Sequence, residues 1–139
     1  MIRSSWLALA LALAVAGAAV ADTPSVKVPL LPQNGSKIGG TATITHLSVK
    51  APAVVDVRIV LDGVFIPENR YPAGVYAGTC SKMGAEPAYE LNPVVGGRSD
   101  TRLHVSAPKP GPYVVAVFNT TETKTMSCGA LPAMKHDKQ

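Results

Sequence analysis

Residues 54–62, Val54-Val55-Asp56-Val57-Arg58-Ile59-Val60-Leu61-Asp62, alternate between a mostly apolar and a mostly polar series of side chains. Successive side chains of a β-strand point to opposite faces, so this period of two predicts a half-buried strand with one face toward solvent. Residues 100–106 repeat the pattern. Residues 113–118 are apolar on both faces and follow Pro110-Gly-Pro112, which indicates an inner strand.

The rest of the chain consists of similar short runs separated by turn signals. Twelve prolines and twelve glycines in 139 residues disfavour long helices, and no stretch shows a sustained helical repeat. Regular short strands with such turns predict an all-β fold, an antiparallel sandwich or flattened barrel of about eight strands. The strands are expected at 26–29, 41–49, 54–62, 73–77, 88–95, 100–106, 112–119 and 125–131.

The N-terminus has the features of an export signal. Arg3 precedes an apolar run over 7–19, which is too short for a comfortable membrane span, and Ala19-Val20-Ala21 fits a cleavage site. The organisation expected from this is a signal peptide (1–21), an extended N-terminal segment with an edge strand near 26–28 (22–38), a β domain (39–132) and a polar tail (133–139). The protein is therefore expected in the periplasm or outside the cell, without stable membrane insertion.

The chain has two cysteines, Cys80 and Cys128, and a net charge of +4. In an exported protein one cysteine pair favours one disulfide, which would stabilise the fold by about 4 kcal/mol in the chain-entropy model. A reactive thiol pair or a two-cysteine metal site is the alternative. The basic residues are scattered rather than clustered on one face, so nucleic-acid binding is not expected.

Five segments of the chain together carry a family resemblance: Gly40-Thr-Ala-Thr-Ile-Thr45, Pro72-Ala-Gly-Val-Tyr-Ala-Gly-Thr-Cys80, 89–99, 113–118 and Ser127-Cys-Gly-Ala130. In their order and spacing they resemble the small secreted members of the copper/zinc superoxide dismutase-like family. The resemblance covers about residues 39–132, and it implies a Greek-key β-barrel in which the two cysteines form an intradomain bridge.

The same comparison implies that the metal centre is missing. Gly74 and Tyr76 stand where active members carry a His-x-His pair of copper ligands, and Phe118 stands where they carry another. Thr125, beside Lys124, replaces the arginine that guides superoxide, and no His/Asp cluster for zinc follows Cys80. A copper ion that cycles between oxidation states is suited by imidazole nitrogen ligands, and Gly74, Tyr76 and Phe118 provide no imidazole. The resemblance therefore implies the scaffold without the enzyme activity and without a cofactor.

Two further groups of side chains are weighed as sites. His46, His104 and His136, with Met126 and Met134, could form a rearranged copper site, but packing and surface roles are the favoured explanation of these residues. Tyr71, Tyr76 and Tyr89 flank Cys80 and either fill the volume of the missing ligands or anchor a partner. No nucleophile–base pair stands out, and carboxylates such as Glu90 are interpreted as solvated.

These observations rank three functional hypotheses. The first is a secreted, non-catalytic superoxide dismutase-like domain that serves as a binding or structural module, with an unidentified protein or glycan partner. The second is a copper-binding or storage protein with a rearranged His/Met site. The third, a true dismutase, is disfavoured by the missing ligands. Homodimerisation through strand edges is left open.

Overall fold

The computed structural model describes residues 24–48, 52–106 and 109–132, and these form antiparallel strands with no helix. The strands are β1 (Ser25–Pro32), β2 (Ile38–Ser48), β3 (Ala53–Gly63), β4 (Arg70–Thr79), β5 (Lys82–Met83), β6 (Tyr89–Val95), β7 (Arg98–Val105), β8 (Tyr113–Phe118) and β9 (Thr125–Ala130).

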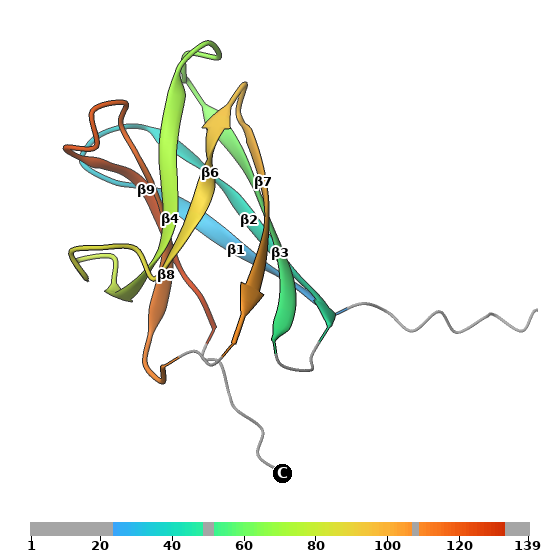
Figure 1. Ribbon diagram of the computed structural model, residues 1–139. Coiled ribbons are helices and arrows are strands. Elements are labelled where there is room, and N and C mark those ends of the chain that lie inside the picture. The colour runs from blue at the N-terminus through green and yellow to red at the C-terminus, as the bar shows by residue number, and fades with distance from the viewer. Residues whose placement is uncertain (1–23, 49–51, 107–108, 133–139) are drawn as a thin grey trace, which may run out of the picture.

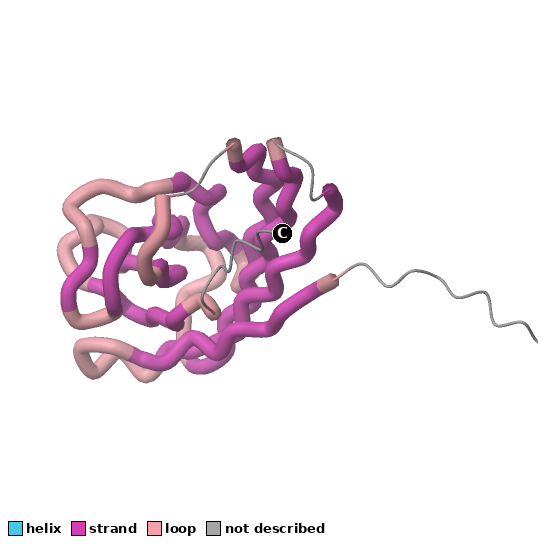
Figure 2. The backbone as a smooth tube through the Cα atoms, turned by 90° about the horizontal axis from the view of Figure 1, so that it is seen from below, coloured by secondary structure: helices cyan, strands magenta, loops and turns pink. Residues whose placement is uncertain are grey.

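Eight of these strands close into a barrel. Their order around the ring is β4-β6-β7-β3-β2-β1-β9-β8, and pairing of β8 with β4 completes the ring (Figure 1). Figure 2 shows the strands arranged around a common interior. The short β5 pairs only with β4 and is an extra strand outside the ring. The all-β antiparallel prediction with about eight strands is confirmed.

Strand β1 departs from its prediction as an edge strand. Residues 25–30 pair with β2, and Leu31 and Pro32 pair with β9. Val28 and Leu30 are buried in the barrel core. The edge assignment is wrong, because barrel closure gives β1 a neighbour on each side.

Strand β3 follows the alternation that predicted it. Its odd-numbered residues 55–61 are buried in the barrel interior. On the outer face, Arg58 Nε donates to Asp100 Oδ1 at 2.7 Å, and Arg102 Nε donates to Asp56 Oδ1 at 3.0 Å. Both ion pairs join residues that face each other in the β3–β7 register. Opposite charges on facing residues stabilise this register and disfavour a one-residue slip.

Strand β8 is buried on both faces, as its sequence predicted. Val115 and Val117 belong to the barrel core, whereas Val114 and Ala116 lie in a second apolar cluster with Tyr76 and Cys128. Cys80, Met83 and Phe118 pack against that second cluster. The outer face of β4, β8 and β9 is therefore covered by the segment that begins at Cys80.

The expected signal peptide (1–21) and polar tail (133–139) lie outside the described residues. In the part of the chain that the structure describes, no helix is long and apolar enough to cross a membrane.

Candidate functional site

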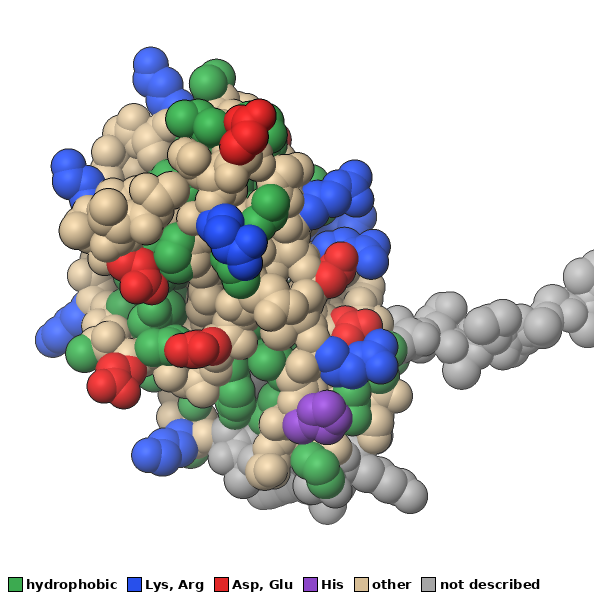
Figure 3. Space-filling model, turned by 45° about the horizontal axis from the view of Figure 1, so that its top comes forward, with side chains coloured by type: hydrophobic (Ala, Val, Ile, Leu, Met, Phe, Trp, Pro, Cys, Tyr) green, Lys and Arg blue, Asp and Glu red, His purple; other side chains and the backbone are tan. Residues whose placement is uncertain are grey.

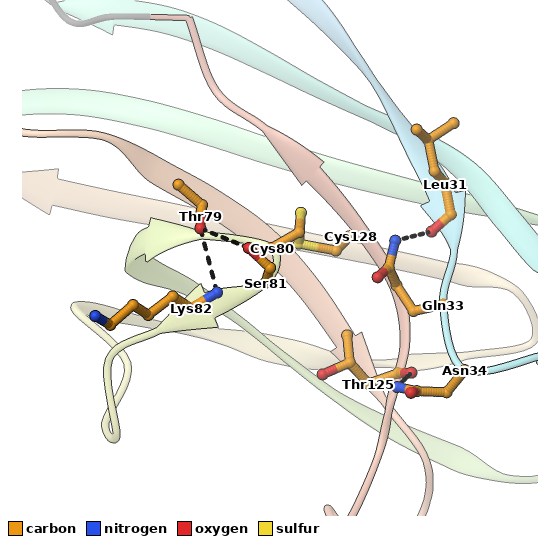
Figure 4. Close-up of a disulfide and its surroundings, with 9 residues drawn as sticks. All are labelled: Leu31, Gln33, Asn34, Thr79, Cys80, Ser81, Lys82, Thr125 and Cys128. Carbon is orange, nitrogen blue, oxygen red and sulfur yellow. Dashed lines mark hydrogen bonds between the residues drawn. A yellow bond between two sulfur atoms is a disulfide. The ribbon is translucent and has the colours of Figure 1, made fainter.

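A disulfide joins Cys80 to Cys128, as predicted (Figure 4). Cys80 follows β4 and Cys128 lies within β9, with Cα atoms 5.9 Å apart. These are the only two cysteines of the chain, so neither is available as a free thiol or a metal ligand. The bridge fixes the segment after β4 to the outer surface of the barrel.

The turn between β4 and β5 is held by its own side chains. Thr79 Oγ1 accepts a hydrogen bond from the backbone N–H of Lys82 at 3.2 Å and lies 3.3 Å from Ser81 Oγ (Figure 4). Gly78 has a φ of 113°, and an added Cβ would collide with the Lys82 carbonyl oxygen. The glycine permits this tight hairpin, which carries Met83 against the second cluster.

A cleft of about 950 Å³ lies beside the disulfide on the outside of the barrel. Its walls come from β4, the segment after Cys80, β6 and the connection between β8 and β9. The residues that line it are Arg70, Pro72, Ala73, Tyr76, Cys80, Ser81, Met83, Gly84, Ala85, Pro87, Glu90, Leu91, Pro93, Phe118, Thr120, Glu122 and Thr125.

The positions where the resemblance placed missing ligands meet at this cleft. Tyr76, Phe118 and Thr125 line it, and the Tyr76 and Phe118 rings pack edge-on with centroids 5.4 Å apart and planes at 68°. Gly74 lies beneath the tyrosine ring, since a Cβ added there would be 3.0 Å from Tyr76 Cε1 and 3.2 Å from Pro87 Cβ. The absence of a side chain at position 74 thus makes room for the Tyr76 ring.

The Tyr76 hydroxyl has an electrostatic environment set by two carboxylates. Only 9% of Tyr76 is exposed, and no residue in 24–48, 52–106 or 109–132 hydrogen-bonds to its hydroxyl. Burial raises the pKa of Tyr76, and the negative charges of Glu122 and Glu90 raise this pKa further. The phenol therefore stays neutral well above ordinary pH and can both donate and accept a hydrogen bond.

Each carboxylate is positioned by a different element. Glu90 faces Gly74 in the register of β6 with β4. Glu122 lies in the turn after β8 with a φ of 58°. Asn119 stabilises that turn, because its Oδ1 accepts from the N–H groups of Thr123 at 2.8 Å and Lys124 at 3.1 Å.

The three tyrosines that flank Cys80 are not brought together. Tyr71 is buried in the barrel core, and its hydroxyl accepts a hydrogen bond from the Ile66 N–H at 3.0 Å. Tyr89 is half-buried and packs against the barrel core. Only Tyr76 faces the cleft, so a joint surface formed by all three is not present.

The residues weighed as a rearranged copper site are also separated. His46 lies on the inner side of the barrel wall, beside an apolar cavity of about 410 Å³, whereas His104 is exposed on the outer side. Met126 is buried in the core, and His136 and Met134 lie outside the described residues. Within the described ranges, no three His, Cys, Asp or Glu side chains are grouped to hold a metal ion.

Sequence reasoning does not bring the polar groups of the cleft together. Its interpretation of Glu90 as a solvated strand residue agrees with the exposed position of this side chain on β6, but it does not single out Glu122, Arg70 or Met83. Period-two alternation could have placed Glu90 on the outer face of its strand with Asn92. No local pattern indicates that the turn carrying Glu122 reaches the same cleft, since this depends on how β8 and β9 pair with β4.

Comparison with known proteins finds no matching family model, no similar curated protein and no similar solved structure.

Proposed function

We propose that this chain is an exported, non-catalytic module built on a superoxide dismutase-like Greek-key scaffold. In it, a metal-free recognition cleft has replaced the metal centre. A partner protein or glycan binds there, and the barrel serves as the rigid support.

The strand order supports the scaffold. Strands β4, β6 and β7 are consecutive neighbours in the ring, and β8 then returns to pair with β4, which gives the spatial order β8-β4-β6-β7. This order supports a Greek-key arrangement, because a fourth strand returns to lie beside the first. The bridge between Cys80 and Cys128 is the one the resemblance implies.

One observation carries the proposal: the positions at which the resemblance places copper-ligand histidines lie together at one cleft, and none of them is a histidine here. Gly74, Tyr76 and Phe118 come from two neighbouring strands, and none of them carries an imidazole. The Tyr76 ring fills the space above Gly74, where a ligand side chain would otherwise point. Dismutation requires a copper ion held by several nitrogen ligands, so this arrangement supports a scaffold without dismutase chemistry.

A recognition role is favoured over a purely structural one because the cleft presents polar groups that the fold does not use. The Tyr76 hydroxyl and the carboxylates of Glu90 and Glu122 have no hydrogen-bond or ion-pair partner within residues 24–48, 52–106 and 109–132. The disulfide holds one wall of the cleft in place, which lowers the ordering cost of binding. It is also compatible with an oxidising compartment, and so with export.

Two measurements test the proposal: an assay of superoxide dismutase activity tests the non-catalytic assignment, and recovery of the protein from the exported fraction tests export. The full chain would be expressed with its own leader and recovered from the exported fraction, and its mass would show whether cleavage follows Ala21. We expect cleavage there and no dismutase activity above that of free copper, even after copper and zinc are supplied. Activity that requires Tyr76 or Phe118 would overturn the non-catalytic assignment, and a chain retained in the cytoplasm would overturn export.

A further inference from the structure

We propose that the cleft recognises an organic cation, namely a primary ammonium or guanidinium group. This inference rests on the proposed function, because it assigns the chemistry of the ligand to the same cleft. The cation can belong to a lysine or arginine side chain of a partner protein or to a free amine.

The first observation is the pair of carboxylates at the rim. Glu90 on β6 and Glu122 in the turn after β8 both line the cleft. The side-chain ion pairs among the described residues, Arg58–Asp100 and Arg102–Asp56, include neither of them. The chain as a whole carries a charge of +4, and basic and acidic side chains are scattered over the face seen in Figure 3. Two carboxylates at one cleft, unpaired within the described residues, therefore form a locally acidic site on a basic protein. Such a site attracts a cation.

The second observation is Tyr76, which lines the cleft together with these carboxylates. It is buried over nine-tenths of its surface, yet its hydroxyl has no hydrogen-bond partner among the described residues. Burial raises the pKa of Tyr76, and the negative charges of Glu122 and Glu90 raise this pKa further. The hydroxyl opens to the cleft and can accept a hydrogen bond from an N–H group of a ligand.

The apolar walls favour an organic cation over a metal ion. Met83, Pro87 and Phe118 line the cleft together with the carboxylates. Calcium requires about six to eight oxygen ligands, whereas the described residues contain no group of even three His, Cys, Asp or Glu that could hold a metal. The alkyl stem of lysine or arginine would instead pack on these walls, with its charged end at the carboxylates and over the edge-packed Tyr76 and Phe118 rings.

Arg70 also lines the cleft but lies far along β4. It is the first residue of β4, and Tyr76 follows six residues later, about 20 Å away in an extended strand. At physiological salt the Debye length is about 8 Å, so the charge of Arg70 is largely screened at the Tyr76 end of the cleft.

The test is a nuclear magnetic resonance titration of the isotope-labelled, oxidised full chain. The probes are Nα-acetyl-lysine methylamide, its uncharged norleucine analogue, n-butylamine and calcium alone. We expect the lysine compound to shift the amides of Ser81, Met83 and Glu90 with an affinity on the order of 1 mM, weakened by salt. We expect the norleucine analogue and calcium to leave these amides in place. Tighter binding of the lysine compound than of butylamine assigns a partner side chain, and the reverse order assigns a free amine.

Three variants of the cleft and one control make the result specific. Glu90→Gln and Glu122→Gln are each expected to weaken binding about threefold, and the double variant about tenfold. Glu68→Gln removes an exposed carboxylate outside the cleft and is expected to change nothing. Equal binding of the norleucine analogue, equal affinity in the double variant, no shift in the presence of the lysine compound, or the same shifts with calcium would each overturn the inference. None of these results would restore copper chemistry, so failure here is distinguishable from failure of the proposed function.

Discussion

Replacing Gly74 with alanine tests whether the Tyr76 ring occupies the space of the missing ligand. The glycine lies within β4, and its φ is not positive, so alanine can adopt the same backbone conformation. In open space this change would stabilise a strand by about 0.5–1 kcal/mol, because glycine loses more backbone entropy on folding. Here the new Cβ would lie 3.0 Å from Tyr76 Cε1 and 3.2 Å from Pro87 Cβ.

Neither neighbour can move away without loss of other contacts. The Tyr76 ring packs on Phe118, and Pro87 lies in the segment that the disulfide fixes to β9. Overpacking of this kind costs about 1–3 kcal/mol, which exceeds the gain in backbone entropy. We therefore expect Gly74→Ala to lower the free energy of unfolding by about 1 kcal/mol.

Urea unfolding of four proteins would measure this effect: wild type, Gly74→Ala, Tyr76→Ala and the double variant. Because the closer of the two tight contacts is with the ring, Gly74→Ala should cost less in the Tyr76→Ala background, with a coupling energy of about 0.5–1 kcal/mol. Gly84→Ala is the matched control. Its Cβ would meet nothing closer than 3.6 Å, so a small gain in stability is expected there. A similar gain from Gly74→Ala in both backgrounds would refute the proposed packing.

Three other predictions concern the bridge, a buried hydroxyl and the cleft phenol. Replacing Cys80 and Cys128 with alanine should cost about 4 kcal/mol in urea unfolding, because the bridge spans 48 residues; an unchanged midpoint would contradict this. Ser127→Ala should gain about 1 kcal/mol, because its buried Oγ has no partner among the described residues; a loss would point to a partner. Tyr76 should ionise above 10.0, so Tyr76→Phe should remove a tyrosinate absorbance step above that pH. The stability contributed by the raised pKa of Tyr76 should be complete below pH 10 and lost as pH rises through that pKa, and ionisation of Tyr76 at its ordinary pKa would argue against the carboxylate environment.

Much of the barrel could be predicted because most strands have one buried and one solvated face. Alternation over 54–62 and 100–106 is the direct consequence of that geometry, and the structure confirms β3 and β7 there. The inner position of β8 followed from its apolar residues on both faces. The disulfide was predictable because an expected export signal and a single cysteine pair leave few alternatives.

What the sequence could not predict depends on contacts between distant elements. Strand β5 has two residues and no alternation, and it forms only because the turn at Thr79 and the disulfide bring it back against β4. The inner position of β1 depends on ring closure. The pairing of β8 with β9 shifts register between Val117 and Phe118. The consecutive residues Met126 and Ser127 of β9 are both buried at this point, whereas simple alternation would place them on opposite faces of the strand.

The cleft illustrates the same limit. Gly74, Tyr76 and Phe118 were identified through the resemblance, but the two carboxylates beside Tyr76 were not. Their proximity follows from the β4–β6 register and from the conformation of the turn after β8. Neither is encoded in a local pattern of residues.

The metal content of the exported, oxidised protein decides whether the cleft is free of a metal centre. The protein would be purified without chelator, challenged with copper and zinc, freed of excess ion and analysed for bound metal. We expect no retention beyond trace stoichiometry, because the positions at the cleft offer no imidazole. Retention of about one copper per chain, lost on replacement of Tyr76 or of His46 and His104, would contradict this expectation.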